Sequence, residues 1–211
     1  MRIDSRGLVT VAAAFVIGCA TTDSTARGPQ GATDADGAPT VAGASGPQTA
    51  VEAQAFEEFR KRVEAYVSLH KRAEGTLPAR PKETTPEVID RHQRSLAQLI
   101  QKERATARRG DLITPEAERV IKSVLGRIFG GPEGKQLKSS IMDENPGAVK
   151  ISVNGRYPDE VPLSTVPPQV LASLPKLPEE IEYRFVGDRL VLLDAHAHII
   201  IDYIDNALPA A

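Results

Sequence analysis

The chain of 211 residues contains one cysteine, no tryptophan, two methionines, five phenylalanines and four tyrosines. The lone cysteine, Cys19, excludes an intrachain disulfide framework and a zinc site built from several thiolates. With so few aromatic residues, the core must consist mainly of Val, Ile, Leu and Ala. Aromatic residues are also not interleaved with the basic ones, which argues against nucleic acid as a partner.

Long apolar runs are also lacking. The run over residues 7–18 would span only about 18 Å as a helix, well short of the roughly 30 Å hydrocarbon core of a bilayer. This run follows Arg2 and Arg6 and ends in small residues, which is the pattern of a secretory signal peptide. We therefore predict a signal peptide over residues 1–18 and no permanent transmembrane helix in it.

The run Val16-Ile17-Gly18-Cys19 resembles the lipobox of bacterial lipoprotein precursors, in which a diacylglyceryl group is added to the cysteine before cleavage. The resemblance implies that Cys19 becomes the first residue of a lipid-anchored protein of the cell envelope, with the membrane as a partner. In this resemblance, a residue other than aspartate after the cysteine favours sorting to the outer membrane. Ala20 therefore implies that the anchored protein faces the periplasm from the outer membrane, if the organism has two membranes. Acylation would leave no free thiol. The alternative is ordinary signal cleavage, which would leave a secreted protein.

Residues 19–50 comprise the lipidated cysteine and a stretch rich in Ala, Gly, Thr, Ser and Pro, without Leu or aromatic residues after Cys19. Such a composition predicts a disordered tether. Residues 51–211 suit a single globular domain. This part resembles uncharacterised bacterial secreted or lipoprotein-type proteins in the stretches 140–146 and 182–187, and that resemblance implies no particular activity.

Three helices are predicted in the first half of the domain. Apolar residues recur at helical spacing from Phe56 to His70, ahead of Gly75. Thr85-Pro86 and Thr114-Pro115 are typical helix starts, each with a capping hydroxyl followed by proline. We expect the second helix to continue toward Gly110 and the third to end at Gly130, with the three packed as antiparallel neighbours.

The second half predicts strands. Val149–Val153 alternates, Asn154-Gly155 favours a tight turn, and residues 156–158 could form a short partner strand. A short helix is expected to end at Leu174. Ile181–Val186, a turn at Gly187-Asp188 and a second arm from Leu190 to about Ile204 then predict a long hairpin. The fold class is therefore α+β, with an N-terminal three-helix layer and a small antiparallel sheet covered on one face.

Asp194, His196 and His198 are the candidate metal ligands. Residues two apart on a strand point to the same face, and Asp202 shares that parity, so imidazoles and carboxylates could gather around a divalent metal such as zinc. With a two-residue Gly187-Asp188 loop, Asp194, His196 and His198 would lie on the same sheet face as Tyr183 and its alternate neighbours. With a three-residue loop, they would lie on the opposite face. His70 and His92 are predicted to be partly buried packing residues.

These observations favour a lipid-anchored envelope protein that acts as a non-enzymatic binding or structural module, with an envelope protein as its partner. No cofactor or catalytic residue is predicted on this hypothesis, and the sequence does not identify a small-molecule ligand. The alternative is a metal-binding protein or metal-dependent hydrolase that uses Asp194, His196 and His198.

Overall fold

The computed structural model describes residues 49–79, 84–144, 149–159, 161–162 and 164–209. The predicted signal peptide, Cys19 and the tether up to residue 48 lie outside the described residues. Secretion and acylation of Cys19 therefore stay predictions. No helix in the described ranges is long and apolar enough to cross a membrane.

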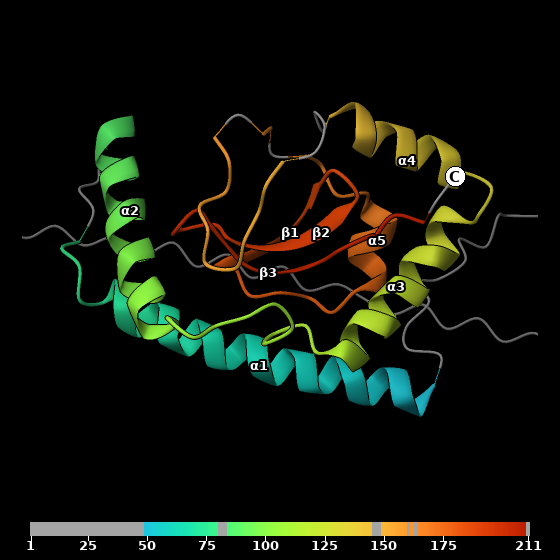
Figure 1. The fold of residues 1–211 in the computed structure, drawn as a ribbon, viewed down its shortest axis with the longest axis horizontal. Coiled ribbons are helices and arrows are strands. Elements are labelled where there is room, and N and C mark those ends of the chain that lie inside the picture. Colours follow the sequence, from blue (N-terminus) through green and yellow to red (C-terminus); the bar gives the residue numbers. More distant parts are fainter. Residues whose placement is uncertain (1–48, 80–83, 145–148, 160, 163, 210–211) are drawn as a thin grey trace, which may run out of the picture. The chain divides into compact units, whose positions relative to one another are not determined.

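Helices precede strands along the described chain, so the α+β fold class is confirmed. The elements are α1 (Ala50–Glu74), α2 (Pro86–Glu103), α3 (Pro115–Phe129), α4 (Gly134–Asp143), α5 (Pro168–Ser173), β1 (Ile181–Val186), β2 (Arg189–Asp194) and β3 (Ile199–Ile204), as Figure 1 shows. Thr49 and Thr114 cap α1 and α3 by accepting the backbone N–H groups of Glu52 and Ala117. These caps satisfy donors that a helix start leaves without a partner.

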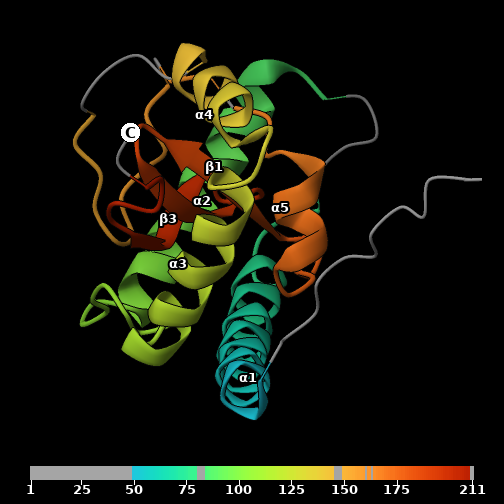
Figure 2. The same cartoon turned by 90° about the vertical axis from the view of Figure 1, so that its right-hand side faces the viewer.

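The helices differ from the prediction in extent and arrangement. α2 ends at Glu103 rather than near Gly110, and α4 was not predicted. α1 contacts both α2 and α3. In the view of Figure 1 these two helices rise from opposite ends of α1, with the sheet between them, rather than lying alongside it as antiparallel neighbours. In Figure 2 α3 is seen beside α5, in keeping with the contact between them.

The sheet is an antiparallel meander in the order β1-β2-β3. Val186 pairs with Arg189, so the loop between β1 and β2 is the two-residue Gly187-Asp188 turn, in which Gly187 takes a positive φ of 61°. This register aligns Asp194 with Ile181 and Leu192 with Tyr183. Asp194 therefore lies on the same face as the residues that pack against the helices.

The predicted second arm is divided in two. Residues 195–198 form a turn between β2 and β3, so His196 and His198 do not lie on a strand, which corrects that prediction. β3 also contains a bulge: Leu193 pairs with Ile200 and Leu192 with Asp202, which leaves Ile201 as the extra residue. The Ile201 carbonyl accepts hydrogen bonds from both Nη1 and Nη2 of Arg104, each at 3.2 Å.

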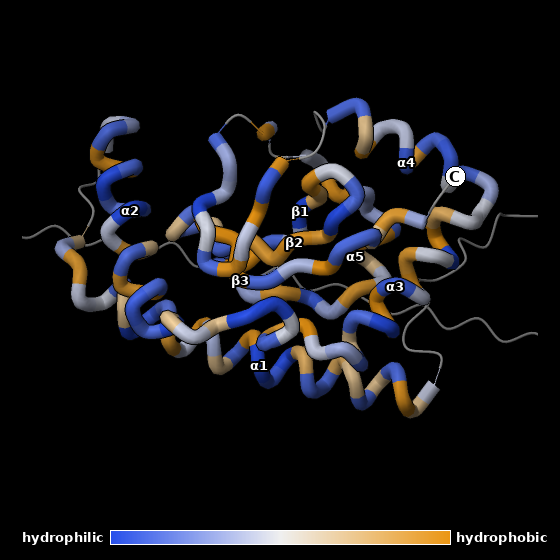
Figure 3. The backbone as a smooth tube through the Cα atoms, viewed as in Figure 1, coloured by the Kyte–Doolittle hydropathy of each residue, from blue (hydrophilic) through white to orange (hydrophobic). Residues whose placement is uncertain are grey.

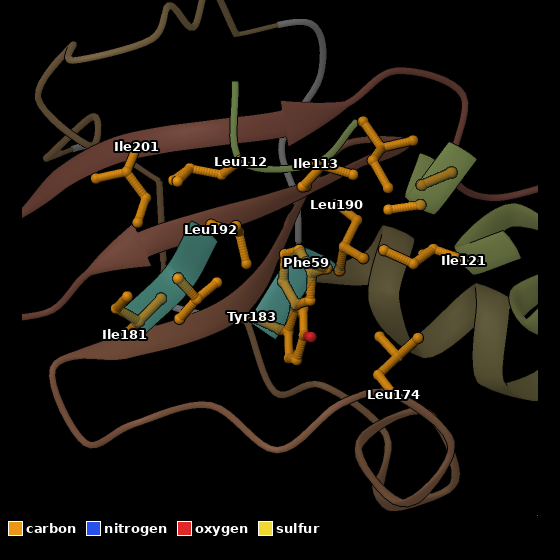
Figure 4. Close-up of a cluster of buried hydrophobic side chains, with 14 of the residues drawn as sticks. Phe59, Leu112, Ile113, Ile121, Leu174, Ile181, Tyr183, Leu190, Leu192 and Ile201 are labelled. Carbon is orange, nitrogen blue, oxygen red and sulfur yellow. The ribbon is translucent and has the colours of Figure 1, made fainter. Parts of the chain in front are cut away.

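Both faces of the sheet are covered, whereas one covered face was predicted. The helices and one face share the larger core, in which Phe59, Ile121 and Leu190 converge in Figure 4. The other face packs in a smaller cluster formed by Tyr157, Val161, Val186, Val191, Leu193 and Ile200. In Figure 3 the strands carry long hydrophobic stretches, while α1 alternates between hydrophobic and hydrophilic residues. That contrast is expected of a two-sided sheet and a helix with one buried face.

The hairpin predicted over residues 149–158 does not form in its described part. The Asn154-Gly155 turn is present, with Asn154 at φ 61° and a hydrogen bond from Gly155 N to Ser152 O. The segment bonds to β3 and to the residue just before it: Asn154 N donates to Ile200 O, and Tyr157 N donates to His198 O. The segment therefore covers the edge of β3.

Candidate metal centre

Three side chains with metal-binding atoms converge where the end of α1 meets the turn after β2. His70, Glu74 and His196 each offer one ligand atom, and these three atoms all lie within 4.8 Å of one another. The His70 Nε2 atom is 3.3 Å from Glu74 Oε2, and His196 Nδ1 is 3.4 Å from the same oxygen. Glu74 Oε2 is therefore the centre of the group.

The helix explains why His70 and Glu74 lie together. Residues four apart on an α-helix share a face, and Tyr66, His70 and Glu74 follow one another at that interval. Tyr66 and His70 belong to the buried stripe of α1, whereas the Glu74 side chain keeps 26% of its surface exposed. This face of α1 is therefore buried at Tyr66 and His70 and partly exposed at Glu74, the last residue of the helix.

Asp194 holds the turn that carries His196. Its Oδ1 atom accepts the backbone N–H groups of His196 at 3.0 Å and Ala197 at 2.8 Å. An aspartate that accepts backbone N–H groups two and three residues later is a common way of stabilising a turn. His198, at φ 55°, then allows the chain to reverse into β3.

The second oxygen of Asp194 orients His70. Asp194 Oδ2 lies 2.6 Å from His70 Nδ1 and accepts the Tyr66 hydroxyl, also at 2.6 Å. A carboxylate only accepts, so Nδ1 carries the hydrogen and, in a neutral ring, the lone pair is on Nε2. That nitrogen faces Glu74. A carboxylate bonded to the far nitrogen of a histidine is the usual support of a histidine metal ligand.

His92 approaches the group from α2. Its Nε2 atom lies 3.3 Å from Oε1 of Glu74, the oxygen that faces away from His70 and His196. The side chain of His92 is mostly buried. Glu74 is thus contacted by three of the four histidines in the chain.

The distances from His70 and His196 to Glu74 Oε2 are compatible with shared coordination of a metal ion. The His70 and His196 nitrogens lie 3.3 and 3.4 Å from Glu74 Oε2, longer than the roughly 2.9 Å of a typical N–H···O hydrogen bond. Two ligands bound to a tetrahedral zinc at about 2.1 Å are about 3.4 Å apart. The two distances to Glu74 Oε2 therefore match two edges of a tetrahedral site, and the His70 and His196 ligand atoms lie within 4.8 Å of each other.

The charges of the group favour a positive charge at this place, either a proton on His70 or a metal ion in its stead. Burial raises the pKa of Glu74, but hydrogen bonds and charge from His92, His196 and His70 outweigh it and lower the pKa below its ordinary value of 4.5. Burial lowers the pKa of His70, but the hydrogen bond and charge of Asp194, with Glu74, outweigh it and raise the pKa above 6.5. Glu74 is thus an ionised ligand at neutral pH.

The structure does not bring the predicted ligands Asp194, His196 and His198 together as one group. The Asp194 carboxylate is fully buried, and both of its oxygens are hydrogen-bonded. His198 points elsewhere: its Nε2 lies 4.0 Å from Asp159, and its ring packs against Tyr157. Burial, with the positive charge of Arg156, lowers the pKa of His198.

Sequence reasoning missed His70, Glu74 and His92 as site residues. His70 and His92 were interpreted as packing residues because they follow apolar positions at helical spacing. The signal that could have identified the first two is the histidine and glutamate four residues apart near the end of a helix, which places two ligand types on one face. Nothing local in the sequence connects them to His196.

The larger surface grooves lie away from this group. One of about 480 Å³ lies between the start of α1 and α3, and one of about 590 Å³ lies beside α5 and β1. Comparison of the chain with protein-family models, with curated proteins and with solved structures gives no match.

Proposed function

We propose that this protein is a lipid-anchored protein of the cell envelope whose folded domain binds a divalent transition metal ion, zinc foremost, through His70, Glu74 and His196. The observation that carries the proposal is the convergence of their three ligand atoms within 4.8 Å. Two imidazoles and one carboxylate are ligands that zinc accepts, and such a set does not suit calcium or magnesium, which prefer oxygen atoms.

The support around the ligands strengthens the proposal. His70 is completely buried and held by Asp194, so its ring has little freedom to turn away from the metal. His196 is held through its own backbone by the same carboxylate. One buried aspartate thus orients both histidine ligands. Oriented ligands lose less conformational entropy when a metal binds.

The envelope location is supported by the sequence. The lipobox-like run at Cys19 would form an anchor, and the 29 mostly polar and small residues 20–48 would form a tether. At about 5.5 Å × √n, such a tether has a typical end-to-end distance near 30 Å. The proposal thus keeps the hypothesis of a binding module and gives that module a metal ion as its ligand.

Metal analysis of the purified, untagged protein tests the metal site. After dialysis against a weak chelator, we expect near-stoichiometric zinc in the wild type and strong loss in His196→Ala. His196 is partly exposed, so its replacement should leave the fold intact. His198→Ala is the matched control, because it removes a histidine of the same turn that faces Asp159. Equal metal content in all three proteins would contradict the proposal.

Fractionation of cells tests the anchor. The wild-type protein should sediment with membranes and enter the detergent phase, since two or more acyl chains give stable anchoring. Cys19→Ala should abolish acylation and move the protein out of the membrane fraction. Unchanged fractionation of the variant would contradict the lipid anchor without affecting the metal site.

A further inference from the structure

This inference rests on the proposed metal site. We propose that the bound metal keeps one coordination position open to water or a small anion, and that His92 positions Glu74 instead of serving as a fourth ligand. The site would then be of the reactive, ligand-exchanging kind. It would not be a closed structural site, in which four protein side chains complete the tetrahedron.

The ligand count carries the first half of the inference. Within the described residues, the group whose ligand atoms all lie within 4.8 Å of one another contains His70, Glu74 and His196 and no fourth histidine, aspartate or glutamate. Tetrahedral zinc needs four ligands. A metal held by these three side chains therefore has one position left for a ligand from solution.

The division of the Glu74 carboxylate carries the second half. Oε2 faces His70 and His196, while Oε1 faces His92. A metal bound through Oε2 leaves Oε1 as a hydrogen-bond acceptor, and His92 Nε2–H can donate to it. Ligating carboxylates are commonly held in this way by a neighbouring donor. His92 thus fixes the rotation of the carboxylate from the opposite side.

Solvent can reach the open position. The exposed fraction of the side chain rises from 0% at His70 through 26% at Glu74 to 32% at His196. The metal would be buried on the His70 side and accessible on the side of Glu74 and His196. The open position would therefore lie on the side where Glu74 and His196 meet solvent.

An open position gives the site a chemistry that a closed site lacks. Zinc that keeps a bound water lowers the pKa of that water toward about 7, so a metal hydroxide forms near neutral pH. The same position exchanges water for small anions. The ligand class that we assign to this site is therefore water, hydroxide and small monodentate anions.

Cobalt(II) substitution of the full chain, with azide as the probe, tests the open position. Cobalt occupies similar nitrogen and oxygen sites, and its visible absorption reports the number and type of ligands. We expect azide to shift the visible bands saturably in the wild type. Bands that do not respond to azide would overturn the open position but leave metal binding standing. Absence of cobalt and zinc binding would overturn the proposed function, and this inference with it.

Variants of His92 test its positioning role. Loss of a residue that orients a metal ligand typically weakens metal binding by about 10–100-fold. We expect His92→Ala to show that loss with unchanged band positions and an unchanged response to azide. His92→Gln should recover part of the affinity, because a carboxamide N–H can donate to Glu74. Shifted bands in His92→Ala would identify His92 as a ligand and overturn its positioning role.

Discussion

Asp194 and Asp202 are both fully buried aspartates of the sheet, yet they have different partners. Asp202 accepts only backbone N–H groups, from Gly110, Leu112, Ile113 and its neighbour Tyr203, at 2.9–3.0 Å. Asp194 gives one oxygen to backbone N–H groups and the other to the side chains of Tyr66 and His70. One carboxylate fastens a loop, while the other also orients side chains.

The difference shows how the same residue type serves structure in one place and a candidate site in another. Backbone donors satisfy the Asp202 carboxylate and hold the loop between α2 and α3 against β3. The partners of Asp194 include an imidazole whose second nitrogen faces Glu74. A substitution at Asp194 should therefore weaken metal binding, whereas a substitution at Asp202 should affect only the loop.

The largest expected effect is that of Asp194→Asn. The amide would keep an oxygen for the turn but would present an NH₂ group to Tyr66 and His70. Breaking a buried charge pair costs about 3–5 kcal/mol of unfolding free energy. We expect a loss of that size in urea unfolding with chelator present, together with weaker zinc binding in a competition titration. Wild-type zinc affinity in this variant would show that Asp194 does not support the ligands.

Zinc itself should distinguish the surroundings of the two aspartates. A ligand at 100 times its dissociation constant stabilises the folded state by about 2.7 kcal/mol. We expect zinc to raise the unfolding free energy of wild type and of Asp202→Asn by similar amounts, and a chelator to reverse the effect. His196→Ala should show little stabilisation. A zinc effect that persists in His196→Ala would place the metal elsewhere.

Asp202→Asn should destabilise the protein while sparing the metal. Its amide group cannot accept all four backbone N–H groups, and an unsatisfied buried donor costs about 1–3 kcal/mol. We expect a loss in that range by urea unfolding and wild-type zinc affinity by titration. If zinc affinity falls as much as in Asp194→Asn, the contrast between the two aspartates is wrong.

The smallest effect concerns pH. Because the pKa of His70 is raised in the folded state, its pair with Asp194 contributes stability that is fully present below the unfolded pKa of about 6.5. That contribution is lost as pH rises through the folded pKa. In chelator, the unfolding free energy of wild type relative to Asp194→Asn should therefore fall on passing from pH 6 to pH 9. A difference that stays constant would show that this pair does not titrate in that range.

The helices were predictable because their signals are local. Thr114-Pro115 begins α3, and Gly130 follows its last residue, as the sequence indicates. The short α5 also begins at a proline pair. α4 was missed because it has neither a side-chain cap nor an acidic first turn. Its stability comes from its contact with α3, in which Ile141 is buried.

The strands were predictable in composition but not in their breaks. Residues 190–204 form a largely apolar stretch without glycine or proline, so no strong turn signal marks residues 195–198. That turn depends on the Asp194 carboxylate, which accepts the N–H groups of His196 and Ala197. The carboxylate is in turn held by Tyr66 and His70, more than 120 residues earlier.

The sequence alone predicted the order of helices and strands, a turn near Gly187-Asp188 and a lipid anchor, because periodicity, caps and short motifs act over a few residues. The structure decided that this turn has two residues, which sets the register of Asp194. The sequence also placed His70 and Glu74 on one helical face. Only the tertiary structure decided which histidines gather around Glu74. His92 and His196 reach it through the packing of α2 and the sheet against α1, and such long-range contacts depend on shape and burial that no local pattern encodes.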